Sequence, residues 1–196
     1  AMLAATRGVN THKGAVYSMG LACGAAGRLW TDAGFPYDIN AILDECARLA
    51  APTARRTLDG LCETTVATAG ERAYLRHGVR GVRGEAADGF PSVRYVALPA
   101  LRAALSKGKT LEQAGTYALL HLIAEVGDTN LIARGGAEGQ RWAARYAARL
   151  LTHGQGFDRA ALERFDAEMI ERDLSPGGCA DLLALSYLLH ALETKE

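Results

Sequence analysis

The sequence has no excess of charge of either sign. Lysine and arginine together number 22, as do aspartate and glutamate, in a chain of 196 residues. Such a balance creates no overall field that would attract nucleic acid or an acidic membrane. We therefore expect neither a nucleic-acid partner nor a membrane surface.

Paired cysteines and long apolar runs are also missing. The four cysteines show no Cys-x-x-Cys spacing, and no His/Cys pattern typical of a zinc site occurs. The longest uncharged run, residues 14–27, is too short to cross a bilayer and is typical of a buried core helix. No secretory signal is recognisable. These features favour a reducing compartment, and we expect a cytoplasmic protein.

Two widespread catalytic motifs are absent as well. The chain has neither the phosphate loop Gly-x-x-x-x-Gly-Lys-Ser/Thr nor the Gly-x-Ser-x-Gly turn of many hydrolases. Lysine is rare, with four residues against eighteen arginines. The planar arginine fork suits phosphates and carboxylates, but alanine, glycine and arginine rise together here, so coding bias is the simpler cause.

Helical periodicity runs along most of the chain, whereas alternating strand patterns are scarce. Start signals support helices: Thr110 and Gln113 form a capping box, Asp158 is placed as an N-cap, and Ser175-Pro176 precedes another helix. We predict an all-α, single-domain bundle of about eight helices. Their approximate ranges are 11–29, 38–49, 56–75, 91–105, 110–126, 138–151, 159–170 and 177–192.

Four segments between these helices depart from helical chemistry, and such departures are expected at functional sites. The first, residues 8–14, brings Asn10, Thr11, His12 and Lys13 to the start of the most apolar helix. Free amides and the helix dipole favour an anion there, so a bound phosphate is one interpretation. A plain helix cap with an exposed histidine and lysine is the other.

The second segment, residues 83–92, lies in a stretch predicted to be a loop, because glycine recurs every third residue among charges. Glu85 and Asp88 are three residues apart, so a single helical turn would place both carboxylates on one side. There they could hold Mg²⁺ or divide acid and base duties. Alternatively, this is a solvated turn whose acids offset arginines such as Arg83.

The third segment, residues 127–136, places Asp128, Thr129 and Asn130 in succession, ahead of Arg134 and a glycine pair. Hard oxygen ligands beside glycines that admit a ligand closely are one interpretation. A turn between helices with Asp128 as N-cap is the other.

The fourth segment, residues 175–182, begins a helix at Ser175 and puts Gly177 and Gly178 in its first turn. Two glycines are costly there unless a phosphate, an adenine or another helix lies against them. Asp181 follows within about a turn, where a carboxylate also complements the helix dipole.

Together, the four segments resemble the signature blocks of the triphosphoribosyl-dephospho-CoA synthase family. The blocks are GVNTHKGAVYSMG, GVRGEAADGFPSV, GDTNLIARGG and SPGGCADLLALSYLL, in the expected order. That family is all-α and transfers the triphosphoribosyl group of ATP to the ribose 2′-hydroxyl of 3′-dephospho-CoA, releasing adenine. The resemblance implies a pentosyltransferase that makes the prosthetic-group precursor for the acyl carrier protein of citrate lyase or of malonate decarboxylase.

The implied reaction, substitution at an anomeric carbon, needs a base for the hydroxyl, assistance to the departing adenine and cations for the triphosphate. We assign Asp88 or Asp181 as the base, include Glu85 in the catalytic set, and expect His12 to orient or donate. Mg²⁺, arriving with ATP, would be held by Asp128 with Glu85 or Asp88. The expected nucleotide-binding set is Asn10, Thr11, Lys13, Arg83, Asn130, Arg134, Ser175, Gly177 and Gly178.

One part of the family pattern has no counterpart here, namely its Pro-Lys-Pro-Gly-Leu-Val-Asp block and Asn-Asn-Gly-Ala-His element. Residues 1–7 also read as the tail of a helix already under way, since no capping residue precedes them. We therefore expect residues 1–196 to form a single helical catalytic domain without the family's N-terminal segment.

Two other functions stay open at this point. A Mg-dependent glycohydrolase of ADP-ribose type would use similar carboxylates, with water as the nucleophile. A non-catalytic carrier-binding subunit would use none of them. The partners implied by the resemblance are ATP and 3′-dephospho-CoA, with a functional link to the phosphoribosyl-transfer step on the acyl carrier protein and a homodimer as one possible assembly.

Overall fold

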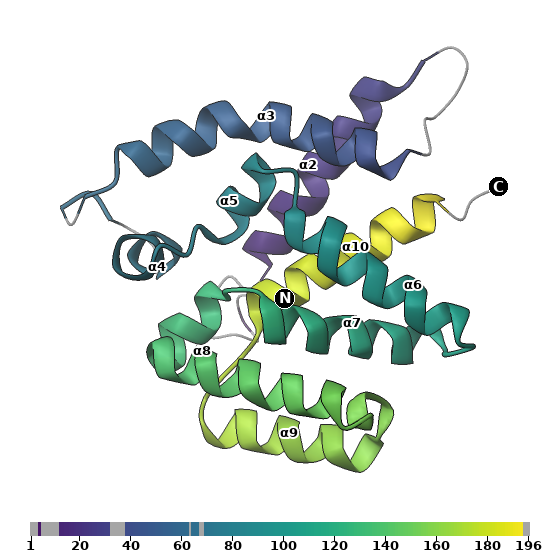
Figure 1. The fold of residues 1–196 in the computed structure, drawn as a ribbon. Helices are drawn as coiled ribbons and strands as arrows, with labels where there is room; N and C mark the ends of the chain where they lie inside the picture. Colours follow the sequence, from purple (N-terminus) through teal and green to yellow (C-terminus); the bar gives the residue numbers. More distant parts are fainter. Residues whose placement is uncertain (1–3, 5–11, 32–37, 63, 67–68, 194–196) are drawn as a thin grey trace.

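A computed structural model describes residues 4, 12–31, 38–62, 64–66 and 69–193, which form helices joined by short connections (Figure 1). These residues contain no β-strand, so the predicted all-α class is confirmed. Within the same ranges, no helix has both the length and the apolar character needed to span a bilayer.

Several helices begin at the capping side chains that predicted them. Helix α7 (Leu111–Glu125) follows Thr110, whose hydroxyl accepts the amide of Gln113 at 3.2 Å while the Gln113 side chain accepts the amide of Thr110 at 3.2 Å. Helix α9 (Arg159–Glu171) is capped by Asp158, which accepts the Ala160 amide at 3.0 Å. Local hydrogen-bonding chemistry therefore fixes these helix starts.

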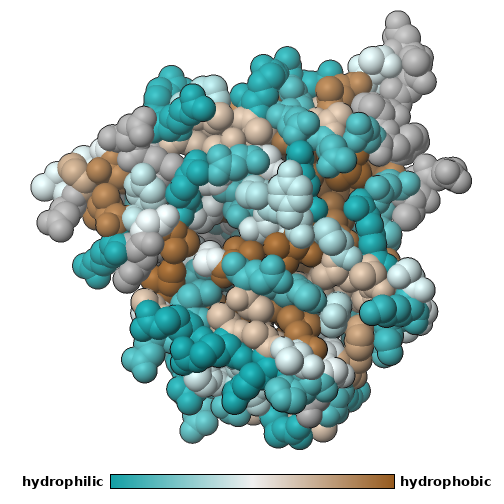
Figure 2. Space-filling view, in the orientation of Figure 1, coloured by the Kyte–Doolittle hydropathy of each residue, from teal (hydrophilic) through white to brown (hydrophobic). Residues whose placement is uncertain are grey.

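The helices stack in layers. In Figure 1, α3 crosses the top of the molecule, α6, α7 and α10 occupy the middle, and α8 with α9 forms the bottom layer. Figure 2 shows hydrophilic residues scattered over all of these layers, with apolar residues exposed between them. The bounds of the other elements are α2 Lys13–Leu29, α3 Ile39–Asp59, α4 Ala69–His77, α5 Gly81–Ala87, the π-helix η1 Val93–Ala97, α6 Leu98–Ser106, α8 Thr129–Thr152, the 3-10 helix η2 Gln155–Phe157 and α10 Gly177–Glu193.

The predicted end of the second helix near residue 49 is wrong. Helix α3 continues through Pro52 to Asp59, and the predicted helix over 56–75 is replaced by the end of α3, a turn and α4. Proline inside a helix removes a hydrogen bond and crowds the preceding turn. Here Ala50 and Ala54 on either side of it are buried in the core, and that packing keeps the helix continuous.

The predicted loop around residues 83–92 is also partly wrong, because it contains the short helix α5. Its Gly84 and Ala86 are buried, and α5 packs against α3. The small residues of this segment, which predicted a loop, instead permit this close packing. The chain then reverses through Gly89 and Phe90, both at positive φ, before the π-helix begins.

Helix α8 begins about nine residues earlier than predicted. It starts at Thr129 with Asp128 as N-cap, and it bends at Gly136, whose φ of 64° lies outside the helical region. The glycine pair at 135–136 therefore marks a kink inside a helix rather than the linker before one.

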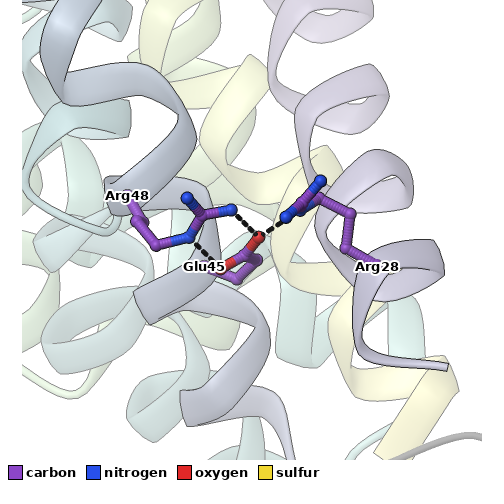
Figure 3. Close-up of polar contacts among 3 residues, drawn as sticks. All are labelled: Arg28, Glu45 and Arg48. Atoms are coloured by element: carbon purple, nitrogen blue, oxygen red, sulfur yellow. Dashed lines mark hydrogen bonds and ion pairs between the residues drawn. The ribbon is translucent and has the colours of Figure 1, made fainter. Parts of the chain in front are cut away.

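An ion-pair clamp joins α2 to α3 (Figure 3). Glu45 of α3 accepts Nε of Arg28 on α2 at 2.7 Å and two nitrogens of Arg48, each at 2.6 Å. These guanidinium groups lower the pKa of Glu45 to about 2, with the hydrogen bonds from Arg48 as the largest cause. The C-terminal end of α2 is thus tied to α3 by a carboxylate that is paired with two guanidinium groups.

Candidate functional site at the starts of α2, α8 and α10

The described residues of the four segments singled out in the sequence lie close together in the fold. The starts of α2, α8 and α10 meet near the centre of the molecule, with α5 close by (Figure 1). Helix α10 packs on both α2 and α8, and α2 also packs on α5. Thr129 lies beside Gly81, where an added Cβ would be 3.1 Å from the threonine methyl group. The described parts of these junctions therefore converge in the fold.

Two glycines let the start of α10 approach the start of α8. An added Cβ on Gly178 would lie 3.2 Å from the carboxylate of Asp128, and one on Gly177 would lie 2.6 Å from Nδ2 of Asn130. With a larger residue at either position, the side chain of Asp128 or Asn130 would have to shift. Close packing between helices, one of the two interpretations of this glycine pair, is therefore confirmed.

Asp128 joins two helix starts. Its side chain is 2% exposed; Oδ1 accepts the amides of Asn130 and Leu131 at 2.7 and 3.2 Å, and Oδ2 accepts the amide of Cys179 at 2.8 Å. Gln140 holds the adjoining backbone, accepting the Asp128 amide at 3.0 Å and donating to Val126. The N-cap interpretation of Asp128 is confirmed, and the cap extends to a second helix.

The predicted magnesium ligands do not form a ready-made metal cage. In the part of the chain that the structure describes, no group of three or more His, Cys, Asp or Glu side chains is placed to hold a metal ion. Three backbone amides already occupy the oxygens of Asp128. Its role as a metal ligand stays a prediction, whereas its role as a cap is visible.

Asp181 on α10 faces the start of α2. A side chain on Gly14 would collide with Oδ2 of Asp181, and the backbone amide of Ala15 donates to this carboxylate. Burial raises the pKa of Asp181 to about 6, helped by the charge of Asp128 and opposed by the Ala15 amide and by His12. A carboxylate with this pKa can exchange a proton near neutral pH.

The two carboxylates of the second segment lie in different environments. Glu85 accepts the amide and the hydroxyl of Ser92 at 3.1 and 2.6 Å, and burial raises its pKa. Burial raises the pKa of the Cys179 thiol, with further contributions from Asp128 and then from the charge of Glu85, which places Glu85 near the start of α10. Asp88 is half exposed and pairs with Arg80 at 2.5 Å. Their assigned roles stay predictions.

The predicted phosphate-binding cations lie on two sides of the junction. Lys13 is exposed at the first position of α2. Arg83 donates to Glu71 at 2.9 Å, and its charge reaches Tyr17, so it lies between α4 and α2. Arg134 pairs with the exposed Asp173 at 2.6 Å on the outer side of α8. Phosphate would have to compete with both carboxylates for these arginines.

The structure says less about four other residues of the predicted set. His12 is the N-cap position of α2 but makes no capping hydrogen bond through its side chain. Ser175 is partly exposed just before α10. Asn10 and Thr11 lie outside the described residues, so their predicted roles stay predictions.

Sequence reasoning missed two residues of this junction. Tyr17 follows Lys13 by four positions, so both lie on one face of α2, and that spacing could have identified it. Burial raises the pKa of Tyr17 and the charge of Arg83 opposes the shift, so the phenol and the guanidinium are close. No sequence pattern could have identified Gln140, because it reaches Asp128 only through the kink in α8.

These features define a class: an all-helical protein with a titratable carboxylate beside three helix starts whose amides favour anions. The family model described as ATP:dephospho-CoA triphosphoribosyl transferase matches residues 1–196. The chain belongs to this family, and the resemblance seen in its sequence blocks is confirmed.

Curated relatives give the same result. The chain is 47% identical over 195 residues to 2-(5''-triphosphoribosyl)-3'-dephosphocoenzyme-A synthase of Pectobacterium atrosepticum, covering 100% of the chain and 63% of the relative. A protein of the same name from Klebsiella pneumoniae is 40% identical over 193 residues, covering 97% and 63%. The chain therefore spans less than two thirds of the length of these relatives. No solved structure matches it significantly.

Proposed function

We propose that the protein containing this chain transfers the triphosphoribosyl group of ATP to the 2′-hydroxyl of 3′-dephospho-CoA. The hydroxyl oxygen forms a bond to C1′ of the ATP ribose, the bond from C1′ to adenine breaks, and adenine leaves with the electron pair and takes up a proton. The hydroxyl proton passes to a base. The carrying observation is Asp181, a partly buried carboxylate with a pKa of about 6 at the junction of α2 and α10.

Asp181 is favoured over Asp88 as the base. At neutral pH most Asp181 side chains are ionised, yet their pKa is high enough to accept a proton from a hydroxyl that becomes acidic in the transition state. Asp88 is instead engaged with Arg80 at the surface. His12, close enough to influence Asp181 electrostatically, would assist the departing adenine or hold the carboxylate in place.

The triphosphate would lie across the helix starts. Amides in the first turn of a helix lack an intrahelical acceptor, and the helix dipole adds positive potential. Gly177 and Gly178 belong to the first turn of α10, and Lys13 to that of α2. Together with Arg83 and Arg134 they would offset the charge that the triphosphate brings.

Magnesium would enter with ATP instead of occupying a resident site. Mg²⁺ usually keeps several waters and takes one or two carboxylates together with substrate phosphates. The described residues offer single carboxylates, Glu85 and Asp88 at α5 and Asp128 beneath α10, and no ready-made cluster. The ion would neutralise phosphate charge there, and the proton transfer to Asp181 does not depend on it.

Tyr17 is proposed as a stacking surface for a substrate base. Its side chain is 38% exposed, one turn beyond Lys13 and beside Arg83. Tyr17 and its neighbour Val16 are large apolar side chains exposed near the start of α2. Both substrates carry an adenine, and aromatic rings bind bases through their faces.

The product would serve as the prosthetic-group precursor for an acyl carrier protein of citrate lyase or malonate decarboxylase. A cytoplasmic location and a homodimer belong to the same proposal. The relatives' names support the reaction, since they name the synthase that makes this triphosphoribosyl derivative of dephospho-CoA.

The deciding experiment is mass spectrometry of the full-length protein incubated with ATP, Mg²⁺ and 3′-dephospho-CoA. We expect a coenzyme species carrying the added triphosphoribosyl group, together with an equal amount of adenine. Free triphosphoribose without the coenzyme adduct would replace the proposal by a glycohydrolase. Absence of both products would favour the carrier-binding subunit.

A further inference from the structure

The hairpin of α8 and α9 carries an ordered ladder of aromatic and cationic side chains, at the opposite end of α8 from Asp128. Rings of Trp142 and Tyr146 on α8 and Phe165 on α9 have centroids 4.6 to 6.0 Å apart. The guanidinium of Arg172 lies 4.3 Å from the Trp142 ring centre, and that of Arg149 lies 4.9 Å from the Tyr146 ring centre. Stacking therefore restricts where these two cations point.

One end of this ladder borders a pocket of about 300 Å³. The pocket is lined by Tyr146, Arg149, Leu150, His153, Ala161 and Arg164. Nδ1 of His153 lies 2.8 Å from the backbone oxygen of Arg149, which can only accept, so Nδ1 donates and the ring orientation is fixed. Two guanidinium groups and one oriented imidazole thus surround a small concave surface with an apolar floor.

The two arginines of this pocket lack a carboxylate partner among the described residues. The arginines that do form ion pairs in the described part of the chain are others, such as Arg80, Arg83, Arg102 and Arg134. Glu168, on α9, accepts the hydroxyl of Tyr146 at 3.2 Å. The charges of Arg149 and Arg164 both reach the same phenol and oppose the rise of its pKa. Positive charge is therefore concentrated in the pocket and incompletely offset.

We propose that this pocket binds the phosphoryl group of a small ligand, at a site separate from the junction of α2, α8 and α10. Planar guanidinium forks match phosphate oxygens, and an arginine already held by an aromatic ring loses little freedom on binding. The volume suits a phosphoryl group with a small attached moiety rather than a whole dinucleotide. The phosphoryl group is either free, as in inorganic phosphate and pyrophosphate, or carried by a nucleotide.

A site-resolved titration tests the proposal without relying on activity. Side-chain Nε–Hε NMR signals of Arg149, Arg164 and Arg145 are followed in the full-length protein during addition of pyrophosphate, and separately of adenosine 5′-monophosphate. Arg145 is the control, because it is exposed on the same helix and does not line the pocket. We expect saturable shifts of Arg149 and Arg164 with one common midpoint, and none of Arg145.

Substitutions complete the test. Arg149→Gln should weaken the response of Arg164 at least tenfold, Arg164→Gln should do the same to Arg149, and Arg145→Gln should leave both responses unchanged. Saturation by only one of the two compounds would identify the source of the phosphoryl group. The proposal is overturned if neither compound gives saturable shifts or if each arginine responds independently of the other. It is also overturned if an acidic peptide, titrated in the same way, shifts both signals and neither compound does.

Discussion

The carboxylates that lie at the two ends of α2 have pKa values shifted in opposite directions. At the C-terminal end, Glu45 is held by two arginines and its pKa falls to about 2. At the N-terminal end, Asp181 is partly buried near a second carboxylate, and its pKa rises to about 6. The first carboxylate is stabilised in its charged form and fastens two helices. The second has a pKa closer to neutral pH, and such a pKa is expected where protons are transferred.

The same contrast separates Asp128 from Asp181 within the junction. The carboxylate of Asp128 accepts hydrogen bonds from backbone amides of two helices and so stabilises the contact between them. Asp181 accepts an amide of α2 but keeps a raised pKa. Asp128 therefore joins two helix starts, whereas Asp181 is the residue that we propose as the base.

The largest expected effect follows from removing the reactive carboxylate. Asp181→Asn should lower the transferase rate of the full-length protein by about 10²–10⁴-fold, the usual contribution of a general base. Its melting temperature should stay the same or rise, because the folded state no longer has to hold a partly buried charge. Adenine release and thermal unfolding measure the two effects. Retention of most of the rate would show that another group is the base.

Asp128→Asn should instead lower the stability of the protein. The amide group would present N–H to a backbone N–H, so one helix start loses its acceptor at a cost of about 1–3 kcal/mol in the free energy of unfolding. Urea denaturation measures it. Asp158→Asn is the control, since asparagine is an equally good cap for the exposed start of α9. Equal stability of the Asp128 variant and wild type would contradict its structural role.

Substitution of Tyr17 separates binding from chemistry. If the ring stacks on an adenine, Tyr17→Ala should raise the KM of one substrate by roughly five- to a hundredfold, with little change in kcat. Tyr17→Phe keeps the ring face and should behave like wild type. Tyr95→Ala, which removes another exposed tyrosine, serves as control. A loss of kcat shared by the alanine and phenylalanine variants would indicate a role for the hydroxyl instead.

The smallest effect is expected at Glu45, beside the C-terminal end of α2. Because the pKa of Glu45 is lowered on folding, its ionisation stabilises the protein above the unfolded value of 4.5, and this stabilisation is lost as pH falls towards about 2. Glu45→Gln should therefore be less stable than wild type at pH 7, with a difference that shrinks below pH 4.5. Denaturation at several pH values measures it; Glu163→Gln, in a largely exposed pair, should show no such difference.

Local chemistry explains which parts of this fold could be predicted. Thr110 with Gln113 and Asp158 specify helix starts through neighbouring amides, so sequence alone identifies them. The continuation of α3 past Pro52 and the formation of α5 depend instead on burial of Ala54 and Ala86 against distant helices. Such tertiary packing overrides local preference and leaves no local signal.

The sequence blocks predicted residues that lie near one another in the fold, but they could not distinguish the environments of those residues. The four blocks identified Asp128, Asp181 and Glu85 together, but equal residue types gave no means of ranking them. What distinguishes them is a contact between residues 51 positions apart, the Cys179 amide on Asp128, and the approach of α2 to Asp181. Both depend on how helices pack, because burial and neighbouring charge set the pKa of a carboxyl group.

The pH dependence of kcat/KM tests the central assignment most directly. If Asp181 must be ionised to accept the hydroxyl proton, kcat/KM of the full-length protein should rise with pH through a single ionisation near 6, and the residual activity of Asp181→Asn should lack that limb. A rate that stays flat between pH 4.5 and 8, or a limb that survives in the variant, would contradict the assignment of Asp181 as the base.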